Sequence, residues 1–126
     1  MHVEHFWQDV LAQNRAELAG YFLPDAVIRW HCTNEQFSVK EFIQANCDYP
    51  GDWKGTIERV ERQENQLITV VRVFSADRSA SHHVVSFIRL EDGKIKALDE
   101  YWAEDGDAPA WRKALAIGRA IPQAGE

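Results

Sequence analysis

The stretch Gly93-Lys94-Ile95-Lys96-Ala97-Leu98-Asp99-Glu100-Tyr101-Trp102 decides how this chain is expected to fold. It follows Asp92, and an Asp-Gly pair between two β-rich runs is a strong signal for a hairpin turn. Strand alternation puts Leu98, Glu100 and Trp102 on one face, and Ile95, Ala97, Asp99 and Tyr101 on the other. Two carboxylates and two aromatics at the end of a core strand exceed what a solvated strand end needs. We therefore predict a pocket or an interface around this strand.

The composition is that of one globular domain over residues 1–126. The chain is long enough for a hydrophobic core, and 45% of it is apolar. The net charge of −6 argues against nucleic acid or an anionic membrane as partner, because both bind basic surfaces. No run approaches the roughly 20 apolar residues of a membrane span. Glu4 and Asp9 interrupt the apolar run that a signal peptide needs. We therefore expect a cytoplasmic protein without nucleic-acid or membrane partners.

The two cysteines, Cys32 and Cys47, are expected to be reduced and buried as small hydrophobes, because cytoplasmic thiols stay reduced. His31 precedes Cys32, but no paired Cys-x-x-Cys or His-x-x-x-His spacing supports a metal site there. We expect no disulfide, no metal and no cofactor.

The first part of the chain is predicted to be mainly helical. Apolar residues at helical spacing predict a helix over Val3 to Leu11. Two capping boxes predict further helix starts, at Asn14 with Glu17 and at Ser38 with Glu41.

Five strands are expected, over residues 26–32, 56–62, 66–74, 81–90 and 95–102. Thr33 to Gln36 is interpreted as a polar connection, and the last four strands form a meander. Helices followed by an antiparallel meander are typical of an α+β domain. The predicted core spans residues 3–112, and residues 113–126 form a weakly helical tail.

The strand over residues 66–74 is apolar on both faces, with Leu67 and Val71 alternating with Ile68 and Val70. A sheet with helices on one face and water on the other alternates more cleanly. The second apolar face needs a cover, and a second subunit is the simplest one. We therefore expect a homodimer joined through the outer face of the sheet.

Motifs along nearly the whole chain resemble the SnoaL-like branch of the nuclear transport factor 2 (NTF2-like) superfamily. They are PDAVIRW (24–30), TNEQF (33–37), ANCDYPGDW (45–53), VSF (85–87), DGKI (92–95), DEYW (99–102) and WR (111–112). The resemblance implies an α+β cone, in which a curved, mostly antiparallel sheet wraps around N-terminal helices and an internal cavity. It also implies dimerisation through the sheet.

The resemblance implies no single reaction. The superfamily includes polyketide cyclases, ketosteroid isomerases, dehydratases and epoxide hydrolases, and also members that only bind or dimerise, so the fold does not choose the function. A ketosteroid isomerase carries its aspartate base on the strand that ends here near Trp30. Our alignment puts Trp30 at that position, and residues near Val85 or Ser86 at the position of the protonated aspartate. Both departures weigh against steroid isomerisation.

Glu100 is the first candidate for a catalytic acid or base, because a carboxylate among aromatics has its charged form disfavoured. The alternative is a structural carboxylate paired with Arg112. Asp99 is the second candidate. It points to the opposite face, so only one of the two lines the cavity unless a bulge intervenes.

His82 and His83 also point to opposite faces, and the inward one is a candidate for proton transfer near neutral pH. We choose His83, because it shares a face with Val85 and Phe87. The alternative is a structural or interfacial histidine.

The candidate ligand-binding residues are mostly aromatic, since such side chains offer flat apolar area with a polar edge. They are Trp30, Trp53, Tyr101 and Trp102, with Glu35 at the pocket mouth. The alternative for the aromatics is core packing, and for Glu35 it is hydrogen bonding to loop amides. No Ser-His-Asp order, phosphate loop or nucleotide fingerprint occurs.

Two functions of different class follow. One is a cofactor-independent isomerase, cyclase or dehydratase that binds a small apolar or aromatic molecule and transfers protons through Glu100 and His83. The other is a non-catalytic binding or dimerisation module. A cavity of roughly 300 Å³ or more that both residues reach would support the enzyme. Aromatic side chains filling the cone would support the module.

Overall fold

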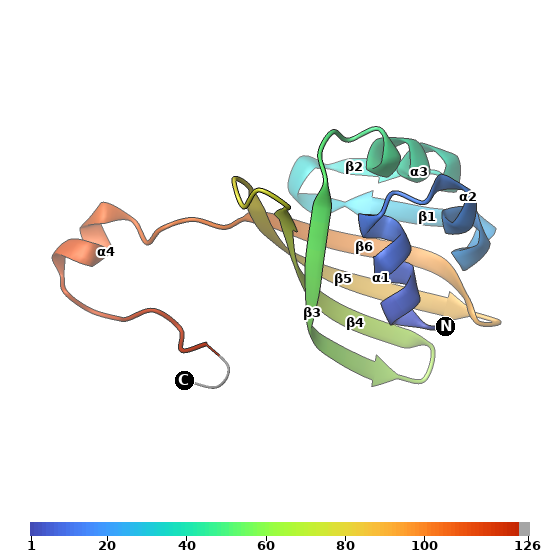
Figure 1. Cartoon of the computed structure of the whole chain (residues 1–126). Helices are drawn as coiled ribbons and strands as arrows, with labels where there is room; N and C mark the ends of the chain where they lie inside the picture. The colour runs from blue at the N-terminus through green and yellow to red at the C-terminus, as the bar shows by residue number, and fades with distance from the viewer. Residues whose placement is uncertain (124–126) are drawn as a thin grey trace.

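The computed structural model describes residues 1–123 and has an α+β fold, in which α1, α2 and α3 cover the concave side of one curved sheet (Figure 1). The helices are α1 (Val3–Leu11), α2 (Arg15–Leu18), α3 (Val39–Cys47) and α4 (Ala110–Ala114), with 3-10 turns η1 (Ala19–Tyr21) and η2 (His31–Thr33). The strands are β1 (Phe22–Trp30), β2 (Glu35–Phe37), β3 (Trp53–Gln63), β4 (Gln66–Ser75), β5 (Ser81–Glu91) and β6 (Lys94–Glu104). Among these residues, no helix is both long and apolar enough to cross a membrane.

The six strands lie in the order β2-β1-β6-β5-β4-β3. β1 and β6 are parallel, and every other neighbouring pair is antiparallel. This confirms the predicted α+β class and the curved, mostly antiparallel sheet wrapped around N-terminal helices. Because β1 returns beside β6, the strand that carries Glu100 lies in the middle of the sheet, with neighbours on both sides.

The core lies between α1 and the inner sheet face. The apolar stripe of α1 (Val3, Phe6, Trp7 and Val10) is buried, as its helical spacing predicts. It packs in one cluster with inner-face residues such as Val71, Val84, Ile88 and Leu98. The indole Nε1 of Trp7 donates a hydrogen bond of 3.2 Å to Thr69 Oγ1, so a polar pair lies inside the core.

Three local predictions need correction. The connection over Thr33 to Gln36 instead contains the end of η2 and most of a short edge strand, β2, which pairs with the end of β1. The capping box at Asn14 does not form, because the Asn14 amide donates to Asp9 Oδ1 at 2.7 Å instead. Cys32 is exposed in η2 and is not a buried hydrophobe. The capping box of Ser38 and Glu41 does form and opens α3.

The strand pairing is irregular at several points, and one of these shifts changes which side chains point inward. The pairing of β1 with β6 is irregular between Phe22 and Val27, around Pro24, which has no N–H to donate. The pairing of β5 with β6 shifts between Arg89 and Leu90. This second bulge turns Ile95 into the core, whereas strict alternation predicts it on the face of Ala97 and Asp99.

The chain after β6 leaves the body. We call residues 105–123 the C-terminal arm. It leads away from the sheet, and its only helix among the described residues is α4 (Figure 1). The predicted tail over residues 113–126 starts inside α4, and its residues 124–126 lie outside the described residues.

Candidate ligand pocket

A pocket of about 280 Å³ opens between α3 and the inner face of the sheet. Its walls come from β1 and η2, from α3 and the loop after it, and from the ends of β3, β4, β5 and β6. The lining residues are Trp30, Cys32, Thr33, Ala45, Tyr49, Trp53, Val73, His82 and Trp102. Trp30, Trp53 and Trp102, all proposed from the sequence as ligand-binding, therefore meet in one apolar pocket.

Aromatic rings form much of the wall, and they meet mostly edge to face. The centroid of Trp53 lies 6.2 Å from that of His82, and His82 lies 6.4 Å from Trp102, with interplanar angles of 61° and 75°. Tyr49 stacks on Trp53 at 5.3 Å. Such arrangements favour a defined ring geometry, so the pocket keeps a fixed shape.

Glu100 lies behind two of these rings and is only 2% exposed. Its Oε1 accepts hydrogen bonds from the indole Nε1 of Trp30 at 3.1 Å and of Trp102 at 3.4 Å. Its Oε2 accepts a bond of 2.6 Å from Ser86 Oγ. The carboxylate therefore contacts the pocket walls but does not line the pocket itself. Strand register explains this, since Glu100 pairs with Ser86 and Trp30 on its two sides.

Burial raises the pKa of Glu100, and the hydrogen bonds from Ser86, Trp102 and Trp30 only partly oppose this. The three hydrogen bonds that it receives from residues 1–123 all come from neutral groups. Arg112, which the sequence suggested as a structural partner, instead lies over the ring of Trp111 at 5.2 Å, in the C-terminal arm. Glu100 is thus a buried carboxyl held by neutral donors.

Asp99 and Tyr101 lie on the outer face of the sheet, away from the pocket. Oδ1 of Asp99 is 2.7 Å from Nε2 of His31 and 3.7 Å from Nη1 of Arg29. Tyr101 is 43% exposed and stacks on His31 at 4.5 Å. These side chains form a surface cluster, and neither lines the pocket.

The choice of His83 as the inward histidine is wrong, because His82 lines the pocket. On β5 the inner face carries Val84 and Ser86, so Val85 and His83 share the outer face. Nδ1 of His83 contacts Asp105, and its Nε2 lies 3.1 Å from Glu58 Oε1. The hydrogen bond with Asp105 raises the pKa of His83, although burial opposes it.

Glu35 lies on the edge strand β2 and does not line the pocket. Its Oε1 accepts a hydrogen bond of 2.7 Å from Thr33 Oγ1, next to it in the loop. The alternative from the sequence was hydrogen bonding to loop amides, whereas this partner is a side-chain hydroxyl.

Sequence reasoning missed five lining residues: Cys32, Thr33, Ala45, Tyr49 and Val73. Ala45 and Tyr49 lie in the motif over residues 45–53, so that motif carried a usable signal. Val73 follows from alternation along β4. Cys32 was assigned to a strand, and only the observed turn η2 explains its position.

A wider depression of about 940 Å³ lies at the other end of the hairpins, between the turns after β3 and β5. Polar and charged residues such as Glu64, Arg89 and Lys96 surround it, and it lies open to solvent. The smaller pocket is the better candidate, because ligand sites are enclosed and mostly apolar. Within residues 1–123, no group of three or more His, Cys, Asp or Glu side chains could hold a metal ion.

Comparisons with known proteins find similar folds among solved structures. No protein-family model matches the chain, and no curated protein matches it. Similar crystal structures include a protein assigned as a ketosteroid isomerase from Kribbella flavida DSM 17836, with a TM-score of 0.78 and 20% identity over 97% of this chain and 88% of the other. An NTF2-like protein of unknown function from Burkholderia xenovorans LB400 has a TM-score of 0.75 and 18% identity over 98% of this chain and 92% of the other.

A third similar structure holds a small molecule. It is a protein with a ketosteroid isomerase-like fold from Catenulispora acidiphila DSM 44928 in complex with trimethylamine, with a TM-score of 0.68 and 12% identity over 79% of this chain and 84% of the other. At these identities the likeness concerns the fold and not the reaction. The motifs, the sheet order and these structures agree, and the chain has the fold of the NTF2-like superfamily.

Proposed function

We propose that this protein binds a small, largely apolar or aromatic molecule in the pocket between Trp30, Trp53 and Trp102. The observation that carries the proposal is the lining itself, an apolar space of about 280 Å³ whose walls are mainly aromatic rings. Its volume is just below the usual range for ligand sites, which favours a compact ligand. The trimethylamine bound to the protein from Catenulispora acidiphila supports the use of this fold for small molecules.

The catalytic form of this proposal is cofactor-free proton transfer, as in an isomerase, cyclase or dehydratase. His82 is then the acid or base, because its imidazole lines the pocket. Glu100 is a positioning residue in this proposal, because two indoles separate its carboxyl from the ligand space. That separation equally favours a non-catalytic binding module, which is our second candidate function.

Binding is tested with flat aromatic probes, 2-naphthol and indole. Each should raise the melting temperature with increasing concentration, because a ligand of the native state stabilises it, by about 2.7 kcal/mol at a hundred times its Kd. The variant Ala45→Trp should lose this shift, since Ala45 lines the pocket on α3. A matched control, Ala19→Trp, changes an exposed residue in η1 and should keep it. Equal shifts in both variants would place binding elsewhere, and no shift with wild type would refute the proposal.

Proton transfer is tested with 2-tetralone, a flat ketone with acidic α-protons. The wild-type protein should exchange these protons for deuterium in D₂O faster than buffer alone, as followed by NMR. His82→Gln should bring the rate back to that of buffer while 2-naphthol still binds. Exchange at the buffer rate with wild type, alongside normal probe binding, would select the non-catalytic module.

We also propose that two copies pair through the outer sheet face. Supporting this, apolar side chains from β4, β5 and β6 lie next to one another there: Ile68, Val70, Val85, Phe87 and Tyr101. We call this group the outer apolar cluster. Phe87 is 37% exposed at its centre, and exposed apolar clusters mark interaction sites. Light scattering should give a dimer for wild type and a monomer for Phe87→Glu, and a wild-type monomer at 100 µM would refute the pairing. The cytoplasmic location expected from the sequence stays a prediction.

A further inference from the structure

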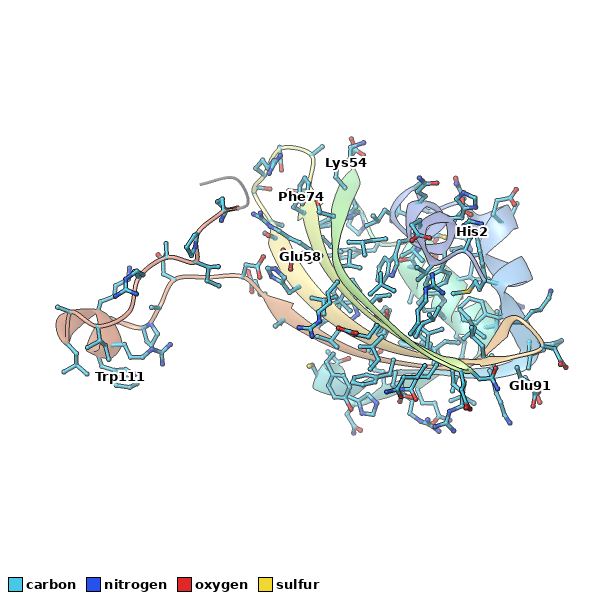
Figure 2. All side chains as sticks on the ribbon, turned by 90° about the horizontal axis from the view of Figure 1, so that it is seen from below. His2, Lys54, Glu58, Phe74, Glu91 and Trp111 are labelled. Carbon is cyan, nitrogen blue, oxygen red and sulfur yellow. The ribbon has the colours of Figure 1, made fainter. Side chains whose placement is uncertain are left out.

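The C-terminal arm presents large apolar side chains to solvent. The exposed fractions are 62% for Trp111, 58% for Leu115, 63% for Ile117 and 85% for Ile121. Figure 2 shows Trp111 far from the sheet and from the N-terminal helices. Exposed apolar area of this kind on one segment costs free energy in water and marks a contact surface.

The outer part of the arm, residues 110–123, has a charge opposite to that of the rest of the chain. Residues 110–123 carry Arg112, Lys113 and Arg119 and no acidic side chain. Residues 1–109 carry eleven basic and nineteen acidic side chains, a net charge of −8. This outer part is therefore both apolar and basic, and an acidic protein surface with an apolar centre complements it.

The root of the arm is fixed to the sheet. The Asp105 N–H donates a hydrogen bond of 2.9 Å to the carbonyl of Ser81, and Ser81 Oγ donates one of 2.5 Å to Asp105 Oδ2. His83 contacts the same carboxylate. Hydrogen bonds from Ser81 and His83 outweigh the effect of burial and lower the pKa of Asp105, so it stays an anion at neutral pH. These contacts hold the start of the arm beside the first residues of β5.

The arm lies largely within the part of the chain that two similar structures match. The matches to the proteins from Kribbella flavida and Burkholderia xenovorans cover 97% and 98% of this chain, which leaves too few unmatched residues for the arm to be excluded. The match to the Catenulispora acidiphila protein covers 79%. A segment after β6 is therefore part of this version of the fold.

We propose that the arm docks on the outer sheet face of a second copy of this chain. There Trp111 and Leu115 would contact the rim of the outer apolar cluster, beside the area that the two paired sheets cover, and the basic side chains of the arm would meet the acidic body. Glu58 and Asp99 flank the cluster, and each also contacts a histidine of its own chain, His83 and His31. The inference rests on the proposed pairing of two copies but adds a distinct contact, because the arm reaches across to its partner.

The first experiment measures the dimer dissociation constant by sedimentation. The double variant Trp111→Ser/Leu115→Ser should weaken the dimer at least tenfold, and 0.5 M salt should weaken the wild-type dimer, because salt screens the opposite charges. The control Asp107→Ser changes an exposed acidic residue of the same arm and should not weaken the dimer. An unchanged dissociation constant in the double variant would overturn the arm contact and leave the sheet pairing standing. Monomeric wild type would overturn both.

The second experiment locates the contact. A photo-crosslinking benzoylphenylalanine replaces Leu115 in a ¹⁴N chain, which is mixed with an unsubstituted ¹⁵N chain. We expect crosslinks from position 115 of the ¹⁴N chain to peptides of β4 and β5 of the ¹⁵N chain. Crosslinks within one chain, or none at all, would overturn the proposal.

Discussion

Replacing Glu100 with Gln tests how the buried carboxyl is held. The Gln carbonyl can accept the two indole N–H bonds that Oε1 accepts from Trp30 and Trp102, and its NH₂ group can donate to Ser86 Oγ. Shape and hydrogen bonds are thus largely kept, and only the ionisation is lost. Replacing Glu100 with Leu instead removes the acceptor to which Trp30, Ser86 and Trp102 donate.

The sign of the pH effect follows from the raised pKa. A carboxyl whose pKa is higher in the folded than in the unfolded chain contributes its full stability below the unfolded value, about 4.3. That contribution is lost as the pH rises through the folded pKa. Each pKa unit of difference costs the wild-type protein about 1.4 kcal/mol at pH values above the folded pKa. Glu100→Gln does not ionise, so it should be at least as stable as wild type at pH 8.

Urea unfolding at pH 4.5 and pH 8, followed by circular dichroism, measures both effects. The free energy of unfolding of Glu100→Gln, minus that of wild type, should increase from pH 4.5 to pH 8. Other groups titrate alike in both proteins and cancel in this difference. Glu100→Leu should be less stable at both pH values by at least about 1–3 kcal/mol, because that is the cost of a single buried donor without a partner. A Gln variant that loses stability between pH 4.5 and pH 8, relative to wild type, would refute the reasoning.

Three further perturbations test the scaffold. Ser38→Ala removes the capping box with Glu41 and should lower the free energy of unfolding by about 1 kcal/mol in urea melts, whereas no change would mean that the cap adds nothing. Thr69→Val leaves the Trp7 indole N–H without its partner and should cost about 1–3 kcal/mol, and a more stable variant would contradict this. His83 has a raised pKa, so its stabilising contribution is complete below about pH 6.5 and is lost as the pH rises through the folded value. His83→Gln should therefore destabilise more at pH 6 than at pH 8.5, and the reverse order in thermal melts would contradict the assigned ion pairs.

The fold could be predicted because its signals are local and repeated. The apolar stripe of α1, the Ser38 capping box and the Asp92-Gly93 turn each act within a few residues, and the structure has all three. The edge strand β2 was not predictable in this way. It has only three residues, and its strand geometry comes from pairing with the end of β1, far more than from its own polar sequence.

The candidate site was predictable in composition but not in orientation. The aromatic residues Trp30, Trp53 and Trp102 stood out in the sequence, and they do meet. Which of two neighbouring residues points inward depends on the register of the whole sheet, since a shift of one residue reverses the faces. For the pair Asp99 and Glu100, the apolar neighbours of Glu100 gave the correct face. For His82 and His83, the chosen neighbour Val85 belongs to the outer face.

The position of Glu100 links the scaffold to the pocket. Its hydrogen bonds join β1, β5 and β6, and they tie together the one parallel strand pair through Trp30. Because both indole N–H groups point at Glu100, which does not line the pocket, the apolar parts of Trp30 and Trp102 are left to face the pocket. A carboxyl buried in this way costs free energy. Its hydrogen bonds hold Trp30 and Trp102, two walls of the pocket, in place from the side away from the pocket. A change at Glu100 should therefore alter ligand affinity without removing any ligand contact.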